Sequence, residues 1–133
     1  MPNLSTHLEI IHRYLKAIED GTFSSIEGLF APGMIIEQFP NRIYPQGVRH
    51  DVAQMAVGFE KGRKLLSAQT YEIKNAIVDE DSVAVEVLWT GTLAVSLGTL
   101  SVGSQMRANC AMFFKFKEGK IAGQRNYDCF ELW

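Results

Sequence analysis

Two polar side chains near the end of the chain have a spacing that suits proton transfer. Asn126 and Asp128 are two positions apart in the strand-like stretch 120–131, and residues two apart in a strand share one face of the sheet. If that face borders an apolar interior, burial raises the pKa of the Asp128 carboxyl, which then accepts a proton near neutral pH. Asn126 would polarise a carbonyl oxygen beside it. Asp128 and Asn126 are therefore candidate catalytic residues.

A third candidate, Tyr14, comes from the beginning of the chain. Residues 5–20 place apolar side chains such as Ile11 and Leu15 at helical spacing, with Tyr14 at the edge of that face. Its hydroxyl suits donation to an oxyanion or a carbonyl. A core tyrosine whose hydroxyl is satisfied by the protein fits the same pattern. Tyr14 is thus either a catalytic donor or part of the core.

Further side chains are expected to line an apolar pocket around these groups, although each also fits an ordinary place in the core. The alternation in strand 34–39 leaves open whether Gln38 or Glu37 points inward. Cys110 is not expected to act as a nucleophile, because neither a basic residue nor a helix start lies beside it. The predicted pocket-lining residues are Gln38, Met55, Phe59, Trp89, Cys110, Met112, Phe114 and Phe130.

Strong catalytic or ligand-binding motifs are absent from the sequence. It contains no Gly-rich phosphate loop before a helix, no HExxH and no G-x-S-x-G. His7, His12 and His50 are scattered, and neither cysteine belongs to a CxxC pair. We therefore expect no metal and no organic cofactor.

Composition narrows the class of protein further. The 133 residues are 47% hydrophobic with a net charge of −2, which fits one domain spanning residues 1–133. The acidic balance disfavours nucleic acid as a partner. No apolar stretch approaches the roughly 20 residues of a membrane span, and no secretory signal opens the chain. With only two cysteines, we expect a soluble cytoplasmic protein.

Hydrophobic periodicity predicts helices in the first half of the chain and long strands in the second. The predicted helices cover residues 5–20, 24–30 and 50–66, and short strands are expected at 34–39 and 42–44. A period of two then marks strands at 71–78, 83–93, 104–117 and 120–131, with an irregular segment at 94–103. This order predicts an α+β fold in which three helices close a cone-shaped, curved antiparallel sheet of five to six strands. A cone encloses a central cavity, the default ligand site.

The turn of the last hairpin decides which residues of its second strand face that cavity. A three-residue loop ending in Gly119 would pair Phe116 with Lys120 and turn the even-numbered residues inward, Asp128 among them. A two-residue turn at Glu118-Gly119 would turn the odd-numbered residues inward instead. We favour the first, because it does not force Glu118 to a positive φ.

Several local strings resemble the nuclear transport factor 2-like superfamily, which includes SnoaL-like polyketide cyclases, ketosteroid isomerases and limonene epoxide hydrolases. The resemblance covers nearly the whole chain. It rests on Ile11-His12-Arg13-Tyr14, Leu29-Phe30-Ala31-Pro32 and Ile36-Glu37 at the start, and on Phe114-Lys115-Phe116, Gly119-Lys120-Ile121 and Arg125-Asn126-Tyr127-Asp128 at the end. Because this fold hosts many activities, the resemblance implies a fold more strongly than a function.

Only part of the catalytic machinery of these relatives is matched. Tyr14 matches the helix-one tyrosine of ketosteroid isomerases, but their two acidic positions fall at or beside Gln38 and near Met112. The Arg-x-Asp pair of the epoxide hydrolases corresponds to Arg107-Ala108-Asn109, which lacks the acid. The final-strand aspartate of the SnoaL-like cyclases corresponds to either Asn126 or Asp128.

The resemblance implies a protein that binds a small hydrophobic molecule. The enzymatic reading is a cyclase- or isomerase-like acid–base catalyst that transfers a proton next to a carbonyl. The alternative is a ligand-binding or interaction module with the same fold and no chemistry. Family members commonly dimerise through the sheet, which implies a homodimer here, with Arg107, Ala111, Phe113 and Trp133 as a mixed surface.

Overall fold

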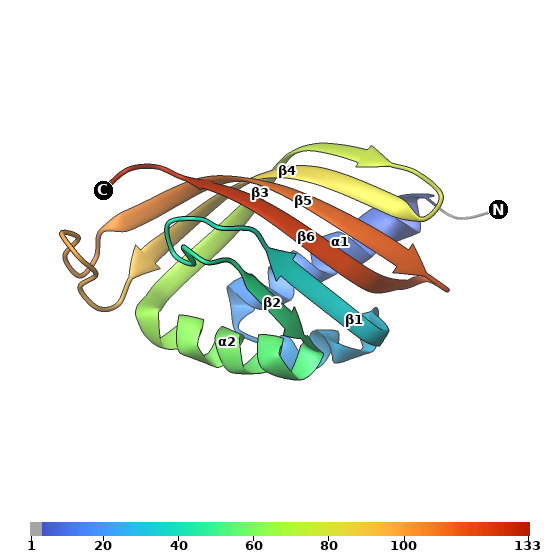
Figure 1. The fold of residues 1–133 in the computed structure, drawn as a ribbon, viewed down its shortest axis with the longest axis horizontal. Helices are drawn as coiled ribbons and strands as arrows, with labels where there is room; N and C mark the ends of the chain where they lie inside the picture. The colour runs from blue at the N-terminus through green and yellow to red at the C-terminus, as the bar shows by residue number, and fades with distance from the viewer. Residues whose placement is uncertain (1–3) are drawn as a thin grey trace.

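The computed structural model describes residues 4–133, with side chains from residue 6 onward. The chain begins with helix α1 (Leu4–Asp20) and a 3-10 helix, η1 (Phe23–Leu29), and α2 (Val52–Leu65) follows later. The strands are β1 (Phe30–Gln38), β2 (Val48–Asp51), β3 (Leu66–Val78), β4 (Ser82–Leu93), β5 (Gln105–Lys117) and β6 (Lys120–Phe130). Figure 1 shows the helices gathered on one side of a curved sheet. The predicted α+β class, with three helices and a curved sheet, is confirmed.

The six strands form one sheet in the order β2-β1-β6-β5-β4-β3. Neighbouring strands are antiparallel except β1 and β6, which run parallel. The predicted antiparallel sheet is therefore mixed, because this one pair is parallel. The chain between β1 and β6 contains α2 and four strands, so β6 is not tied to β1 by a hairpin and enters the sheet in the same direction.

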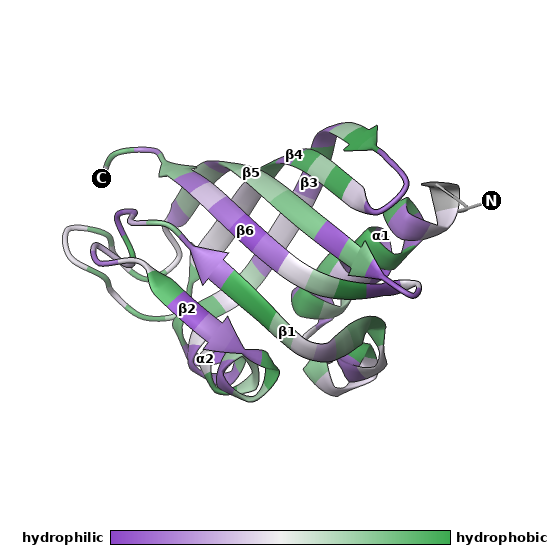
Figure 2. Cartoon of the chain, turned by 45° about the vertical axis from the view of Figure 1, so that its right-hand side comes forward, coloured by the Kyte–Doolittle hydropathy of each residue, from purple (hydrophilic) through white to green (hydrophobic). Residues whose placement is uncertain are grey.

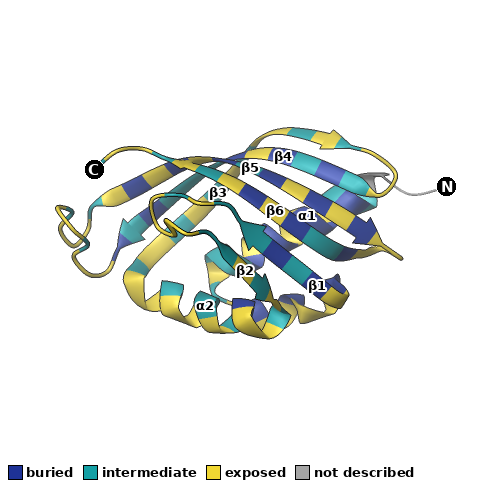
Figure 3. Ribbon diagram, viewed as in Figure 1, coloured by how far each residue is buried: buried dark blue, intermediate teal, exposed yellow. Residues whose placement is uncertain are grey.

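The two α-helices contribute very differently to the core. α1 buries Ile11, Tyr14 and Leu15 against the sheet. α2 starts at a capping box, in which the Asp51 carboxylate accepts from the Gln54 N–H, but Met55 is its one buried residue. Figure 3 shows α2 largely exposed along its outer side. α2 therefore forms an outer wall of the cavity, whereas α1 belongs to the core.

The strand predicted at residues 42–44 does not form. The Asn41 side chain accepts hydrogen bonds from the backbone N–H groups of Ile43 (2.9 Å) and Tyr44 (3.0 Å), which closes a local turn. The short edge strand lies later, at β2, where His50 pairs with Ile36 of β1. Local side-chain hydrogen bonds therefore outcompeted strand pairing in this segment.

The last hairpin combines both predicted registers. Its turn has two residues, because Lys117 pairs with Lys120, and both Glu118 (φ 51°) and Gly119 (φ 77°) are left-handed. The preference for a three-residue loop was therefore wrong. The register then shifts between Phe116–Ile121 and Lys115–Gly123, so the chain accommodates one extra residue in β6. Beyond this bulge the even-numbered residues face inward, as predicted, while before it Ile121 is buried.

Alternation of burial follows the pleat along most of the sheet. Figure 3 shows buried and exposed residues alternating along β5 and β6, whereas Figure 2 shows a hydrophilic stretch in the middle of β6, where Gln124, Arg125 and Asn126 follow one another. The inward face of β5 runs from Met106 to Phe116 without a polar side chain. Within residues 4–133, no helix has both the length and the apolar character that crossing a membrane requires.

Candidate active site

A cavity of about 730 Å³ opens between the concave face of the sheet and the helices. Its size falls in the range that encloses a drug-sized ligand. Apolar walls come from α1, α2 and the inward residues of β4 and β5, and polar groups come mostly from β6 and the loop after β1. The curvature of the sheet therefore brings side chains together from segments far apart in the sequence.

The structure places nearly all of the predicted site residues on the cavity wall. Asp128, Asn126, Tyr14, Gln38, Met55, Phe59, Trp89, Cys110, Met112 and Phe130 all line it. Phe114 does not, which corrects the prediction for that residue. It lies one pleat deeper along β5 than Met112, where its ring contacts Tyr14 edge-on (centroids 6.0 Å apart), and it belongs to the core.

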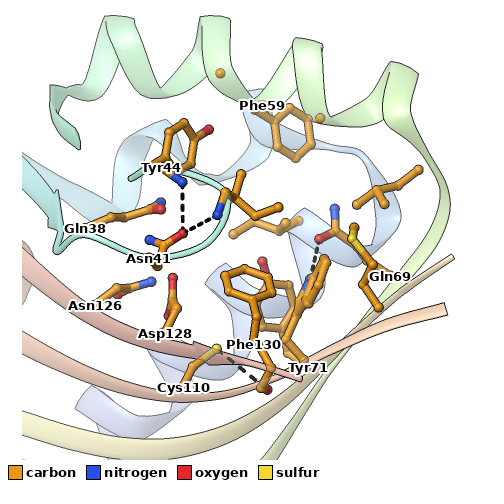
Figure 4. A pocket seen from close by; sticks show the side chains of 18 of the residues that line it. Gln38, Asn41, Tyr44, Phe59, Gln69, Tyr71, Cys110, Asn126, Asp128 and Phe130 are labelled. Atoms are coloured by element: carbon orange, nitrogen blue, oxygen red, sulfur yellow. Dashed lines mark hydrogen bonds between the residues drawn. The ribbon is translucent and has the colours of Figure 1, made fainter. Parts of the chain in front are cut away.

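Asp128 lies opposite Cys110 on the neighbouring strand, with both side chains directed into the cavity. Among the residues that the structure describes, its Oδ1 atom is buried and has no hydrogen-bond partner. Burial raises the pKa of Asp128 above its ordinary value, and the Cys110 thiol offsets part of that rise. Figure 4 shows Asp128 and Asn126 reaching from β6 into the cavity. A carboxyl in this setting is a potential proton acceptor near neutral pH.

Cys110 itself remains a thiol. Burial raises its pKa, and the nearby Asp128 carboxyl raises it further. The Cys110 sulfur therefore keeps its proton, and nucleophilic chemistry at Cys110 is disfavoured.

Tyr14 lines the cavity, but its hydroxyl is engaged by a neighbouring side chain. Its hydroxyl donates to Gln124 Oε1 (2.7 Å), and Gln124 Nε2 donates to Asn126 Oδ1 (2.8 Å). All three residues are buried. Burial also raises the pKa of Tyr14, so the phenol keeps its proton. The structure thus favours the core interpretation of Tyr14 and adds Gln124, which the sequence analysis did not single out.

Tyr71 is a cavity residue that the sequence analysis missed. It lines the cavity from β3, and its hydroxyl makes no hydrogen bond to any residue that the structure describes. Burial raises its pKa, as do the nearby Tyr14, Cys110 and Asp128, so the phenol is a proton donor. The alternation in β3 marks Tyr71 as a member of one face, but a register irregularity between Ile73 and Asn75 obscures which face is inward.

Trp89 and Trp133 shape two further parts of the wall. The Trp89 indole N–H donates to Gln69 Oε1 (3.0 Å). The Arg42 guanidinium lies 4.3 Å from the Trp133 ring centroid and donates to its carbonyl oxygen (2.7 Å). Trp133 also packs edge-on against Phe130. It therefore lines the cavity and does not lie on the outer sheet face where a dimer surface was predicted.

Metal ligands do not gather in this part of the chain. No three His, Cys, Asp or Glu side chains come together as a metal site within the described residues. The polar groups beside the apolar wall of β5 include a carboxyl with a raised pKa, the Asn126 amide and the Tyr71 phenol. Their chemistry is that of general acid–base transfer with hydrogen-bond stabilisation of an oxygen anion.

A curved mixed sheet closed by helices around such a cavity defines the nuclear transport factor 2-like fold. The family model for the SnoaL-like domain matches residues 11–124. This chain therefore belongs to the SnoaL-like domain family, in agreement with the predicted resemblance. No curated protein matches the chain in sequence.

Solved structures agree on the fold across proteins of different activity. A candidate hydroxylase from Streptomyces galilaeus aligns with a TM-score of 0.77 at 18% identity, covering 95% of this chain and 76% of its own. A candidate polyketide cyclase from Acidithiobacillus ferrooxidans gives 0.76 at 22% identity, covering 96% and 91%. An epoxide hydrolase from Mycobacterium tuberculosis gives 0.75 at 12% identity, covering 96% and 85%. At these identities the similarity establishes the fold and leaves the reaction open.

Proposed function

We propose that this protein binds a small hydrophobic carbonyl compound and transfers a proton at the carbon next to the carbonyl. The observation that carries the proposal is the Asp128 carboxyl, whose Oδ1 is buried in the cavity wall without a hydrogen-bond partner among the described residues. A base for this reaction needs a raised pKa and an apolar setting, which weakens competing solvation by water. A purely structural aspartate at this depth would normally be hydrogen-bonded.

The reaction follows from the three groups that border the cavity. The Asp128 carboxylate takes the proton from carbon, the electron pair of the C–H bond forms a carbon–carbon double bond, and the π pair of the carbonyl moves onto its oxygen. Asn126 Nδ2 and the Tyr71 hydroxyl donate hydrogen bonds to the resulting enolate. Return of the proton from Asp128 to a different carbon isomerises the compound. Attack of the enolate on a second carbonyl instead closes a ring, and the proton held by Asp128 passes to the new alkoxide. Cyclase- and isomerase-like outcomes thus share one first step.

The alternative function is ligand binding without chemistry in the same cavity. The apolar walls and the volume of about 730 Å³ support binding in either case. The two functions differ only in whether Asp128 exchanges a proton with the ligand, so one substitution at Asp128 separates them.

The test uses 2-tetralone, an aromatic ketone with exchangeable hydrogens next to its carbonyl, in deuterated buffer. Proton NMR follows deuterium uptake at that carbon, and quenching of tryptophan fluorescence follows binding, since Trp89 lines the cavity. We expect the wild type to accelerate exchange and Asp128→Asn to lose at least about 100-fold of that rate, within the range of general base catalysis. Binding should persist in the variant.

Asp81→Asn is the matched control. This carboxylate is exposed and paired with Lys115 (3.1 Å), outside the cavity. Its removal should leave exchange unchanged. Exchange that survives in Asp128→Asn, or 2-tetralone binding with no exchange by the wild type, would favour the binding function.

A further inference from the structure

We propose that Tyr14 and Gln124 are positioning residues that fix the orientation of the Asn126 amide, so that its Nδ2 group donates into the cavity. The inference deepens the proposed function, on which its ligand class rests: the ligand must present a hydrogen-bond acceptor beside Asp128. Three buried side chains from α1 and β6 carry the argument.

The orientation begins at Tyr14, because a phenol has one proton to donate. The Tyr14 side chain is 2% exposed, and its hydroxyl lies 2.7 Å from Gln124 Oε1. A buried hydroxyl proton without an acceptor is costly. The Gln124 amide must therefore turn its oxygen toward Tyr14, and this places its nitrogen on the opposite side.

Gln124 passes this orientation on to Asn126. Its Nε2 group lies 2.8 Å from Asn126 Oδ1 and is a donor only, so the Asn126 oxygen must face it. The Asn126 nitrogen then points away from Gln124. In Figure 4 this nitrogen lies on the side of Asp128, within the cavity. The proton of a core tyrosine thus sets the hydrogen-bonding character of the cavity wall.

The opposite orientation of the Gln124 and Asn126 amides is unfavourable both at Tyr14 and at Asp128. If both amides were flipped, Gln124 Nε2 would face the Tyr14 oxygen, and the phenolic proton would have no acceptor among its contacts. At the other end, Asn126 Oδ1 would turn into the cavity beside the Asp128 carboxyl, an unfavourable approach of two acceptors. Both amides are nearly fully buried, so water offers little compensation.

Within the part of the chain that the structure describes, no second side chain is hydrogen-bonded to the Asn126 amide and so could set its orientation. The titratable side chains around Asp128 are Tyr14 of α1, Tyr71 of β3 and Cys110 of β5. Two more line the cavity elsewhere, namely Arg42 in the loop after β1 and His50 in β2. None of them is hydrogen-bonded to the Asn126 amide. The orientation of Asn126 therefore depends on Gln124 and, through it, on Tyr14.

The test compares 2-tetralone with tetralin, the hydrocarbon of nearly the same shape without the carbonyl. Tryptophan fluorescence gives the Kd of each, and their ratio isolates the hydrogen bond to the carbonyl. We expect the wild type to prefer 2-tetralone by about three- to tenfold, the range of one neutral hydrogen bond. Tyr14→Phe removes the donor that fixes the Gln124 amide, so this amide is free to flip. The ratio of the tetralin Kd to the 2-tetralone Kd should then fall to less than half of its wild-type value. Tetralin affinity should not change.

A double-mutant cycle separates positioning from a general structural effect. In an Asn126→Leu background the preference is already lost, so adding Tyr14→Phe should change nothing further. Tyr127→Phe, on the outward face of the same strand, is the matched control and should keep the wild-type preference. A preference that Tyr14→Phe leaves intact overturns the proposal, as does a wild type that binds both probes equally.

A ligand-free measurement covers the possibility that Tyr14→Phe folds poorly. NOEs in the wild type should connect the Gln124 side-chain amide protons to Asn126 and be weak to the Tyr14 ring. Strong NOEs from these protons to the Tyr14 ring would show the reversed amide and overturn the proposal. Neither readout requires turnover, so a failure here is distinguishable from a failure of the proposed reaction.

Discussion

Cys110 and Asp128 are direct neighbours across β5 and β6, and both side chains point to the concave side of the sheet. Two local irregularities produce this relationship. The two-residue turn at Glu118-Gly119 by itself would have placed Cys129 on the inner face, and the extra residue in β6 reverses that parity. The position of the candidate base therefore depends on a bulge near the turn, several residues away.

The stability of the protein should depend on pH through Asp128. Its pKa is raised above 3.8 in the folded state, so the folded protein binds this proton more tightly than the unfolded chain. Stability from this group is complete below the unfolded pKa and is lost as pH rises through the folded pKa. Asp128→Asn should therefore be more stable than the wild type at pH 7, with a gap that closes toward pH 4. Urea unfolding from pH 4 to pH 8 measures this gap.

Asp81→Asn should show the opposite trend and serves as the comparison. Hydrogen bonds from Lys115 and Ser82 lower the pKa of Asp81, so its contribution is present at neutral pH and is lost as pH falls through the folded pKa. If the difference in unfolding free energy between Asp128→Asn and the wild type stays constant from pH 4 to pH 8, the pKa of Asp128 is not shifted by folding.

Residue 91 must be a glycine because the Trp89 indole occupies the space that a side chain would need there. A Cβ at residue 91 would lie 2.5 Å from Trp89 Cζ2 and 3.2 Å from Leu66 Cδ2. Gly91→Ala should push the indole away from Gln69 and cost about 1–3 kcal/mol of unfolding free energy, as overpacking does. Gly62→Ala is the control, because nothing lies within 4 Å of a Cβ there and alanine favours the helix. Equal effects in urea unfolding would contradict this account.

Glu118 occupies a left-handed conformation that suits few side chains. Its φ of 51° and the adjacent Gly119 form a two-residue hairpin turn for which Asn-Gly is a preferred sequence. Glu118→Asn should stabilise the protein by about 1 kcal/mol, since left-handed backbone costs roughly that much for most residues. Glu118→Ala tests whether loss of charge explains the gain. A similar gain in both variants of the urea series would argue against the conformational explanation.

We propose that the protein forms a homodimer through the outer face of the sheet. Phe39 stacks on Tyr127 (centroids 4.7 Å apart), Phe113 packs edge-on against Tyr127, and Arg125 lies over Phe113. Phe113 and Tyr127 remain 38% and 43% exposed, and an exposed aromatic cluster suits burial in an interface. Light scattering should give twice the chain mass of 14.9 kDa for the wild type and a single chain for Phe113→Lys.

Ile77→Lys is the matched control for this surface. Ile77 is 66% exposed on the edge strand β3, away from the aromatic cluster. The Ile77→Lys variant should remain dimeric. A wild type with the mass of one chain would rule out the dimer, and dissociation of both variants would place the interface elsewhere.

The sequence determined the elements and the polarity of their faces. The helical spacing around Ile11 and Leu15 and the uninterrupted inner face from Met106 to Phe116 are local patterns, and each follows directly from side-chain hydropathy. The string Asn126-x-Asp128 likewise defined a pair on one face. These features depend on residues close together in the chain, so a single sequence is sufficient to read them.

Tertiary structure alone decided how those faces meet. The bulge in β6 set which face of that strand is inward, and the fold brought Gln124 within 2.7 Å of Tyr14, 110 residues away in sequence. It also moved Trp133 to the cavity and left Tyr71 without a partner there among the described residues. Periodicity carries no information on such contacts, because they depend on register, strand order and curvature, which many distant residues set together.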